Sequence, residues 1–481
     1  MVVDLLAEDD DALLQQPGRQ LVVDHEERSL GGVGAHDPTV RHPGTSPKAV
    51  LPQADPLSAG RDAGGPAEIG CRARGPVAQT VPVTTTPTVR PLTADDLEQS
   101  VALGIEAFGA IPDGMPRPTR EGFPGPGRLW WGAFDGERLA GRMLRREYHS
   151  WWHGQELPTS GIAGVAVSPE ERGRGLLREL FRAVLDASVE RGDVVSTLYP
   201  TAPGIYRSSG YEVVTTLQTV EVPTAELTRV RPPVGVRTRR ATAADLPAAR
   251  ALYDVWARAQ NGPLTRRGPS FPATDEDVIG DFTGVTLAVD ESDAVVGYCS
   301  WNRGRGYGPE GRIEVQDLLA TTAEGYRALW RLLGSFASVA VRVTVQTSGD
   351  DLARSVLPTL SWTAIESHPY MLRLLDVPAA FTALPARARG TVVLRVHQDA
   401  VSGTDGSYRL TASEDGVTCE RTDPEGDHPT FTPGGLALLW SGAQTCANVR
   451  MAGLLTGGTA EDDAVLDAVC AGRPLHVRDY F

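Results

Sequence analysis

An internal repeat constrains the fold of this chain more than any other sequence feature. The segment RPLTADDL at 90–97 matches RRATAADL at 239–246. In the first copy Val89–Leu92 predicts a strand, and Thr93 predicts the cap of a helix. Each copy continues with a predicted β-hairpin, formed by Leu129–Phe134 with Leu139–Tyr148 and by Val285–Val289 with Val295–Trp301. We therefore expect two successive copies of one α/β unit.

The first copy contains a strand, a glycine-rich loop and a helix in direct succession. Gly164–Val167 predicts a buried strand, Arg172–Gly175 (RGRG) follows it, and apolar residues at helical spacing begin at Leu176. Glycines at a helix start leave backbone N–H groups exposed, and the two arginines add charge for a pyrophosphate. A Gly/Arg run alone is more often a surface turn. Here a second strand, Val194–Tyr199, and a turn at Gly204–Tyr206 favour the phosphate site.

The second copy repeats the letters RGRG at Arg303–Gly306, in a different structural setting. These residues follow a hairpin strand and open no helix. The next elements are a strand at Ile313–Leu318 and a helix at Tyr326–Phe336, and the matching place near Thr321 has no Arg-x-x-Gly. We therefore expect a bound cofactor in the first copy and none in the second.

The remaining parts of the chain differ from the two copies. Residues 1–84 carry Pro, Gly, Asp and Ala clusters with no sustained period, so we expect disorder; a translation start placed too far upstream would also explain them. From about Val377 a small α/β unit is expected. Its strands are predicted at Gly390–Val396, Ser407–Ala412 and Val417–Arg421, and its apolar helix at Leu436–Ser441. The expected domains are 1–84, 85–222, 223–376 and 377–481.

Composition excludes several classes of protein. The chain has 481 residues with 41% hydrophobic content and a net charge of −15. The negative charge argues against nucleic-acid binding and suits cationic substrates, although acidity also simply aids solubility. The five cysteines are odd in number and are not spaced as metal ligands, which favours reduced thiols in the cytoplasm and no metal. No apolar run reaches transmembrane length, and no signal peptide is recognised.

The loop resembles that of the GNAT acetyltransferase family, Arg/Gln-x-x-Gly-x-Gly/Ala. Arg172 takes its first position and Gly175 its second, while Leu177 stands where Gly or Ala is usual. The RGLL form of the loop, and Tyr206 followed by Gly210-Tyr211, are similar to the Eis-type (enhanced intracellular survival) branch. This resemblance covers about residues 85–481. It implies an α/β (α+β) fold with two tandem GNAT domains, the second degenerate, and a sterol-carrier-protein-like third domain.

The resemblance also implies roles for individual residues. Acetyl-CoA contacts carry over to Val165, Ala166, Val167, Arg172, Gly173, Arg174, Gly175, Leu176 and Thr201. Tyr206 takes the place of the general acid for the CoA thiolate, with a packing role as the alternative. The terminal carboxylate of Phe481 takes the place of the base, with a frayed end as the alternative.

An N–H group of the strand at Val165 is expected to stabilise the oxyanion. The acceptor pocket is expected to include Trp256, Glu106 and Asp479, although such residues are usually surface or core. Gly164 stands where the branch often has a bulky aromatic, which predicts a wider pocket.

These features predict a cytoplasmic enzyme that moves acetyl from acetyl-CoA to amines of small polycationic substrates such as aminoglycosides. By resemblance it is expected to be a homo-oligomer, a hexamer, with no nucleic-acid partner and no membrane span. A protein-lysine acetyltransferase remains an alternative, which an open, shallow pocket would favour. A lipid-binding carrier led by the third domain is another, but the intact loop and Tyr206 argue against it.

Overall fold

The computed structural model describes residues 87–111, 117–304, 306–349, 351–358, 360–401, 403–423 and 425–481. The segment 1–84, for which we expected disorder, lies outside these residues, as does Arg305 of the second RGRG run.

Each copy begins with the same capped turn, which explains the repeated sequence. The Asp96 carboxylate accepts a 2.8 Å hydrogen bond from the N–H of Thr93, and Asp245 accepts a 2.9 Å bond from the N–H of Thr242. An arginine from the preceding strand pairs with each aspartate, Arg90 in the first copy and Arg239 in the second. The repeat therefore encodes a helix start rather than a binding site.

The first copy follows the order expected from its sequence. Its elements are β1 (Thr88–Pro91), α1 (Leu97–Phe108), β2 (Arg128–Asp135), β3 (Arg138–Trp152), β4 (Gln155–Val167), α2 (Leu176–Glu190), β5 (Val195–Leu198), α3 (Pro203–Arg207) and β6 (Glu212–Pro223). The predicted strands and the long helix are confirmed. The segment Gly204–Tyr206, expected as a turn, lies in the short helix α3, which Pro203 starts because its fixed φ suits a first helical position.

The second copy repeats this order. Its elements are α4 (Thr224–Leu227), β7 (Val236–Arg240), α5 (Leu246–Arg258), α6 (Asp275–Gly280), β8 (Gly284–Asp290), β9 (Val295–Arg303), β10 (Gly308–Ala320), α7 (Ala323–Gly334), β11 (Ala340–Ser348), α8 (Ala353–Val356) and β12 (Thr363–Leu374). As expected, Arg303 ends a hairpin strand and opens no helix. Its guanidinium donates to the carbonyl oxygens of Arg312 and Val339, so it braces the β9–β10 loop.

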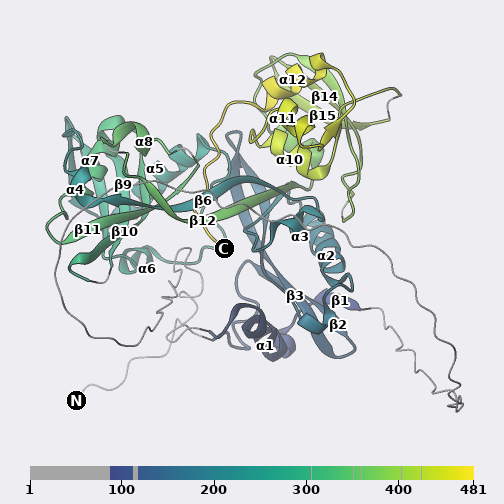
Figure 1. Cartoon of the computed structure of the whole chain (residues 1–481), viewed down its shortest axis with the longest axis horizontal. Helices are drawn as coiled ribbons and strands as arrows, with labels where there is room; N and C mark the ends of the chain where they lie inside the picture. Colours follow the sequence, from purple (N-terminus) through teal and green to yellow (C-terminus); the bar gives the residue numbers. More distant parts are fainter. Residues whose placement is uncertain are drawn as a thin grey trace, which may run out of the picture. The chain divides into compact units, whose positions relative to one another are not determined.

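The two copies share one twelve-stranded sheet, in the order β1-β2-β3-β4-β5-β12-β6-β11-β10-β9-β8-β7. The last strand of the second copy, β12, lies between β5 and β6 of the first, with Met371 opposite Leu198 and Tyr370 opposite Thr215. Strand β6 in turn pairs with β11 of the second copy, and Figure 1 shows the long strands β6 and β12 side by side. Each copy therefore completes the sheet of the other.

The third unit is a small α/β fold with its own sheet, in the order β15-β14-β13-β16-β17. Its elements are α9 (Val377–Thr382), β13 (Gly390–Val396), β14 (Gly406–Ser413), β15 (Gly416–Thr422), β16 (Thr430–Phe431), α10 (Pro433–Trp440), α11 (Cys446–Met451), β17 (Leu455–Thr456) and α12 (Ala460–Cys470). Helix α10 is apolar on all sides and buried along its whole length, with Trp440 fully enclosed. No helix in the described ranges has the length and apolar character to cross a membrane.

Candidate active site

The RGRG loop connects β4 to α2, and two of its glycines have left-handed backbones. Gly173 has φ +78° and Gly175, which precedes the first turn of α2, has φ +80°. Nothing lies within 4 Å of a Cβ built at either position, so backbone conformation rather than crowding requires glycine there. The N–H groups of Arg178 and Glu179 donate to the carbonyl of Gly175. The N–H groups before them in α2 have no intrahelical acceptor and are available to an anion.

The two loop arginines differ in their surroundings. Arg172 is exposed, and its Nε donates a 3.4 Å hydrogen bond to the carbonyl of Val167. Arg174 pairs with the buried carboxylate of Glu171 and lies 3.8 Å from Asp135. Arg172 therefore has no carboxylate partner among the described residues and is available to a pyrophosphate. For Arg174, a pyrophosphate would have to compete with Glu171.

Strands β4 and β5 part beside this loop. They pair in parallel from Thr159 opposite Val195 to Ile162 opposite Leu198, and β4 then continues to Val167 with β3 on one side but without β5 on the other. On its other edge β4 carries a bulge where it pairs with β3 between Arg142 and Leu144. The backbone of 163–167, with half-buried Val165 and Val167 and buried Ala166, therefore faces a gap on the β5 side.

Gly164 lies within this bulge, with φ +55°. A Cβ at this position would lie 2.9 Å from a ring carbon of Trp130. The indole of Trp130 thus occupies the space beside Gly164. The wider pocket expected from the missing aromatic is not seen at this position, because another aromatic side chain from β2 fills it.

Tyr206 is buried in α3, near the end of β5. Its ring packs edge-on against Phe181 of α2, with centroids 5.9 Å apart. Burial raises the pKa of the Tyr206 phenol, although the nearby hydroxyl of Thr201 lowers it somewhat. The phenol therefore keeps its proton at neutral pH, which is the state a general acid needs.

The last residues of the chain reach the first copy. The hydroxyl of Tyr199 donates a 2.8 Å hydrogen bond to the carbonyl of Asp479. The ring of Phe481 lies 5.0 Å from that of Tyr148 on β3 and 5.4 Å from that of Tyr199. It also lies over β4, since a Cβ on Gly161 would meet it at 3.1 Å. The tail 471–481 therefore ends beside the strands that part at the loop.

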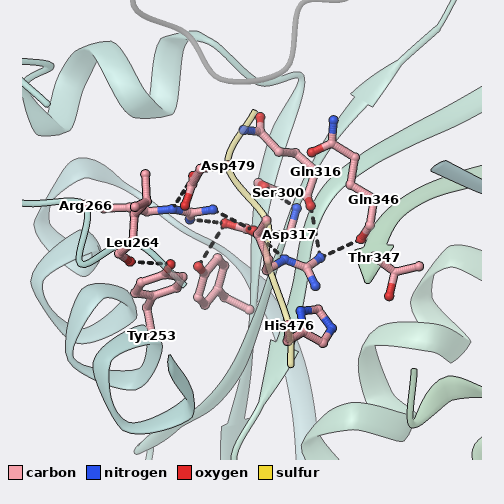
Figure 2. Close-up of polar contacts among 12 residues, drawn as sticks. Tyr253, Leu264, Arg266, Ser300, Gln316, Asp317, Gln346, Thr347, His476 and Asp479 are labelled. Atoms are coloured by element: carbon pink, nitrogen blue, oxygen red, sulfur yellow. Dashed lines mark hydrogen bonds and ion pairs between the residues drawn. The ribbon is translucent and has the colours of Figure 1, made fainter. Parts of the chain in front are cut away.

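The three predicted acceptor-pocket residues lie in different surroundings. Asp479 is 3% exposed, and one of its oxygens is 2.9 Å from Nε of Arg266, as Figure 2 shows. Its Oδ2 has no hydrogen-bond partner in the part of the chain described. Burial raises the pKa of this carboxyl, and this effect outweighs the lowering by the positive charge of Arg266. Trp256 is half-buried against the tail, with centroids 5.0 Å from His476. Glu106 is exposed on α1, and no described hydrogen bond or ion pair joins it to the other site residues.

The structure adds an aromatic cluster that sequence reasoning missed. Tyr370 of β12 lies 5.0 Å from Tyr199, and Tyr480 of the tail lies 4.6 Å from it on ring centroids. The hydroxyls of Tyr370 and Thr197 are buried and lie close to each other, and burial raises the pKa of the Tyr370 phenol. Tyr148 lies on β3, Tyr199 directly after β5 and Tyr370 on β12 of the second copy, so no local sequence signal could have grouped them. Their faces suit a cation.

Comparison with known protein families agrees with this architecture. Residues 88–214 and 262–374 each match an acetyltransferase (GNAT) domain, and residues 377–477 match a sterol carrier protein domain. The chain is 30% identical over 347 residues to an uncharacterized N-acetyltransferase of Streptomyces avermitilis, which covers 67% of this chain and 81% of the relative. It is also 30% identical over 269 residues to the N-acetyltransferase Eis of Mycobacterium tuberculosis, covering 52% and 64% of the two chains.

Solved structures show the same arrangement. The crystal structure of a GCN5-related N-acetyltransferase from Kribbella flavida is 29% identical, with a TM-score of 0.70, and the match covers 82% of this chain and 99% of that one. The structure of Eis1 from Mycobacterium abscessus is 21% identical with a TM-score of 0.66, covering 82% and 100% of the two chains, and supports the fold alone.

Proposed function

The chain belongs to the Eis-type branch of the GNAT acetyltransferases and is an acetyl-CoA-dependent N-acetyltransferase, and we propose that it acetylates amines of small polycationic molecules such as aminoglycosides. Two observations support a cationic acceptor. The chain carries a net charge of −15, which attracts cations over long range. The aromatic cluster around Tyr199 offers ring faces to an ammonium group.

The observation that carries the mechanism is the hydrogen bond between Tyr199 and the carbonyl of Asp479. It fixes the tail two residues before its end, in the first copy, where the loop lies. We assign the base to the terminal carboxylate of Phe481. A terminal carboxylate has an ordinary pKa of about 3.3–3.7, so it is ionised at neutral pH and can take a proton from an ammonium, directly or through water.

The remaining steps use groups at the parting of β4 and β5. Acetyl-CoA is assigned to Val165, Ala166, Val167, Arg172, Gly173, Arg174, Gly175, Leu176 and Thr201. An N–H group of the strand at Val165 would stabilise the oxyanion that forms when the amine attacks the thioester. Tyr206, protonated at neutral pH because burial raises its pKa, would give its proton to the departing CoA thiolate.

We further propose a hexamer working in the cytoplasm. The described cysteines, Cys299, Cys419, Cys446 and Cys470, are all free thiols, which suits a reducing compartment.

A coupled assay of CoA thiol release across a panel of amines tests the proposed substrate class. The panel should hold aminoglycosides, linear polyamines, single amines and lysine peptides at equal concentration. Turnover that rises with the number of cationic groups on a small acceptor supports the proposal. Turnover restricted to lysine peptides would replace it with the protein-lysine alternative.

A further inference from the structure

The second copy contains a counterpart of the gap that is assigned to acetyl-CoA in the first. Strands β10 and β11 are parallel neighbours joined through α7, as β4 and β5 are through α2. Their last paired residues are Val315 and Val345, and β10 then bulges at Gln316 where it pairs with β9. In the first copy the last pair is Ile162 with Leu198, and β4 bulges just after it. Gln316 and Gln346 therefore stand where the strands of the second copy part.

The side chain of Arg478 occupies this second parting. Its Nη2 donates to the carbonyl of Gln346 at 2.7 Å and to the carbonyl of Gln316 at 3.1 Å. Figure 2 labels both glutamines and draws these two hydrogen bonds as dashed lines. Carbonyl groups of parting strands have lost their ladder partners, and leaving them buried and unpaired would be costly. The planar guanidinium of Arg478, which is 2% exposed, satisfies both at once.

A buried carboxylate ties two successive tail residues to the same place. Asp317 of β10 accepts a 3.1 Å hydrogen bond from Nε of Arg478. It also pairs with Arg266 at 2.5 Å, and Arg266 in turn holds the carboxylate of Asp479 at 2.9 Å, as Figure 2 shows. Burial would raise the pKa of Asp317, but the two arginines outweigh it and lower that pKa, so the carboxylate stays charged. Charged hydrogen bonds to buried groups fix orientation more firmly than neutral ones.

We propose that the parting of β10 and β11 is a socket for the chain's own C-terminus, and that Arg478 is the positioning residue that sets the terminal carboxylate of Phe481 at the first copy. This inference rests on the proposed role of that carboxylate as the base. It gives the second copy a function in catalysis without a cofactor of its own: the gap that holds acetyl-CoA in one copy holds the tail in the other.

The first experiment compares Arg478→Met, Arg478→Lys and wild type in the full chain. A base displaced by about 1 Å can lose about 100-fold in rate, so we expect a kcat loss of that order for Arg478→Met. Lysine keeps the charge near Asp317 but lacks the planar fork with which Arg478 reaches Asp317 and both carbonyls together. Its kcat loss should therefore be measurable but smaller than that of Arg478→Met. The dissociation constant of acetyl-CoA, measured by calorimetry, should not change in either variant.

Arg450→Met is the matched control. Arg450 pairs with Asp463 at 2.7 Å and donates to the carbonyl of Gly457 in the third unit, so its removal breaks a partly buried charged contact that includes no tail residue. It should lower stability and leave kcat unchanged. A kcat loss in Arg450→Met equal to that in Arg478→Met would reduce Arg478 to a general structural role and overturn the inference.

The second experiment adds a Gly-Ser-Gly extension after Phe481 to wild type and to Arg478→Met. If Arg478 acts only through the carboxylate, both extended proteins should reach the same low kcat, because the two changes remove one contribution. Losses that multiply would overturn the inference. If Arg478→Met does not fold, Arg478→Lys takes its place in the cycle.

The two proposals fail in different ways. An extension that leaves kcat at the wild-type value removes Phe481 as the base, and the inference with it. An extension that abolishes turnover, together with an Arg478→Met protein that folds, binds acetyl-CoA and keeps full kcat, leaves the base in place and overturns the socket alone.

Discussion

The hydroxyl of Tyr199, at the end of β5, donates a 2.8 Å hydrogen bond to the backbone carbonyl of Asp479, two residues before the end of the chain. This bond links the first copy directly to the tail. The ring of Tyr199 also contacts the rings of Tyr480 and Phe481, with centroids 4.6 and 5.4 Å away. We therefore expect the position of the terminal carboxylate to depend on Tyr199 of the first copy as well as on the proposed socket in the second.

Tyr199→Phe should loosen the tail without removing the aromatic contacts. Loss of one such hydrogen bond lowers the free energy of unfolding by about 0.5–1.5 kcal/mol, and kcat should fall while acetyl-CoA binding stays the same. Urea unfolding and steady-state kinetics measure both effects. Tyr408→Phe is the control, because its hydroxyl makes a similar 2.7 Å bond to Thr404 in the third unit. It should lose stability alone; an equal kcat loss in both variants would contradict the link.

Tyr206→Phe should separate chemistry from binding. The ring and its contact with Phe181 remain, and only the phenolic proton is lost. General acid catalysis is worth about 10²–10⁴-fold, so kcat should fall within that range while the melting temperature and acetyl-CoA affinity are kept. Single-turnover kinetics should be measured as well, because they report the chemical step separately from product release. A variant with wild-type single-turnover rate would remove Tyr206 from the mechanism.

Substitutions in the loop should act on acetyl-CoA alone. Arg172→Ala and Arg174→Ala should each raise the acetyl-CoA KM. The increase should correspond to a loss of about 1.5–3 kcal/mol of binding free energy per lost charged hydrogen bond. The effect of Arg174 should be the smaller, since its guanidinium leaves Glu171 to reach a phosphate. Arg303→Ala is the matched variant from the second RGRG run: it should lower stability and leave this KM unchanged. Equal KM increases at Arg172 and Arg303 would contradict a single cofactor site.

Stability should fall in mild acid because of His153. This side chain is 3% exposed, and its Nε2 lies 2.8 Å from the carbonyl of Trp440. Burial lowers the pKa of His153 to about 4, against about 6.5 in an unfolded chain. As the pH falls, the unfolded chain binds a proton on this histidine before the folded chain does. The free energy of unfolding therefore keeps the full contribution of His153 above a pH of about 6.5. It falls by about 3 kcal/mol as the pH drops toward 4.

His153→Asn tests this assignment, since asparagine tolerates the backbone φ of +54° at this position. Urea unfolding at several pH values between 4 and 8 should show a flatter pH dependence in the variant. An unchanged slope would mean that other groups cause the loss.

Local features of the fold followed from sequence, but long-range pairing did not. The capped turn at Thr93, the hairpins and the α2 helix depend on neighbouring residues, so their patterns were sufficient. The insertion of β12 between β5 and β6 depends on pairs such as Met371 with Leu198. Nothing near either residue indicates the other, so the exchange of strands was not predictable from one sequence.

The candidate site likewise combines residues that local sequence could predict with residues that it could not. The loop and Tyr206 lie in one continuous stretch, and Tyr206 packs against Phe181 of the helix that follows the loop, while their roles remain predictions. Trp256 was expected in the acceptor pocket from its place at the start of the second copy, and its ring contacts Tyr253 of α5 and His476 and Arg478 of the tail. Asp479 was expected as a substrate ligand, yet one oxygen is held by Arg266. Residues distant in sequence decide both, and local composition carries no information about them.

The terminal carboxylate is the centre of this account, and a C-terminal extension tests it most directly. Three residues appended after Phe481 keep its ring and move only the charge, whereas Phe481→Leu changes the ring and keeps the carboxylate. The measurement is kcat for an amine acceptor by thiol release, with acetyl-CoA affinity followed in parallel. We predict that the extended enzyme loses about 10²–10⁴-fold in kcat and binds acetyl-CoA normally, while Phe481→Leu retains far more activity. An extended enzyme that turns over at the wild-type rate would contradict the account.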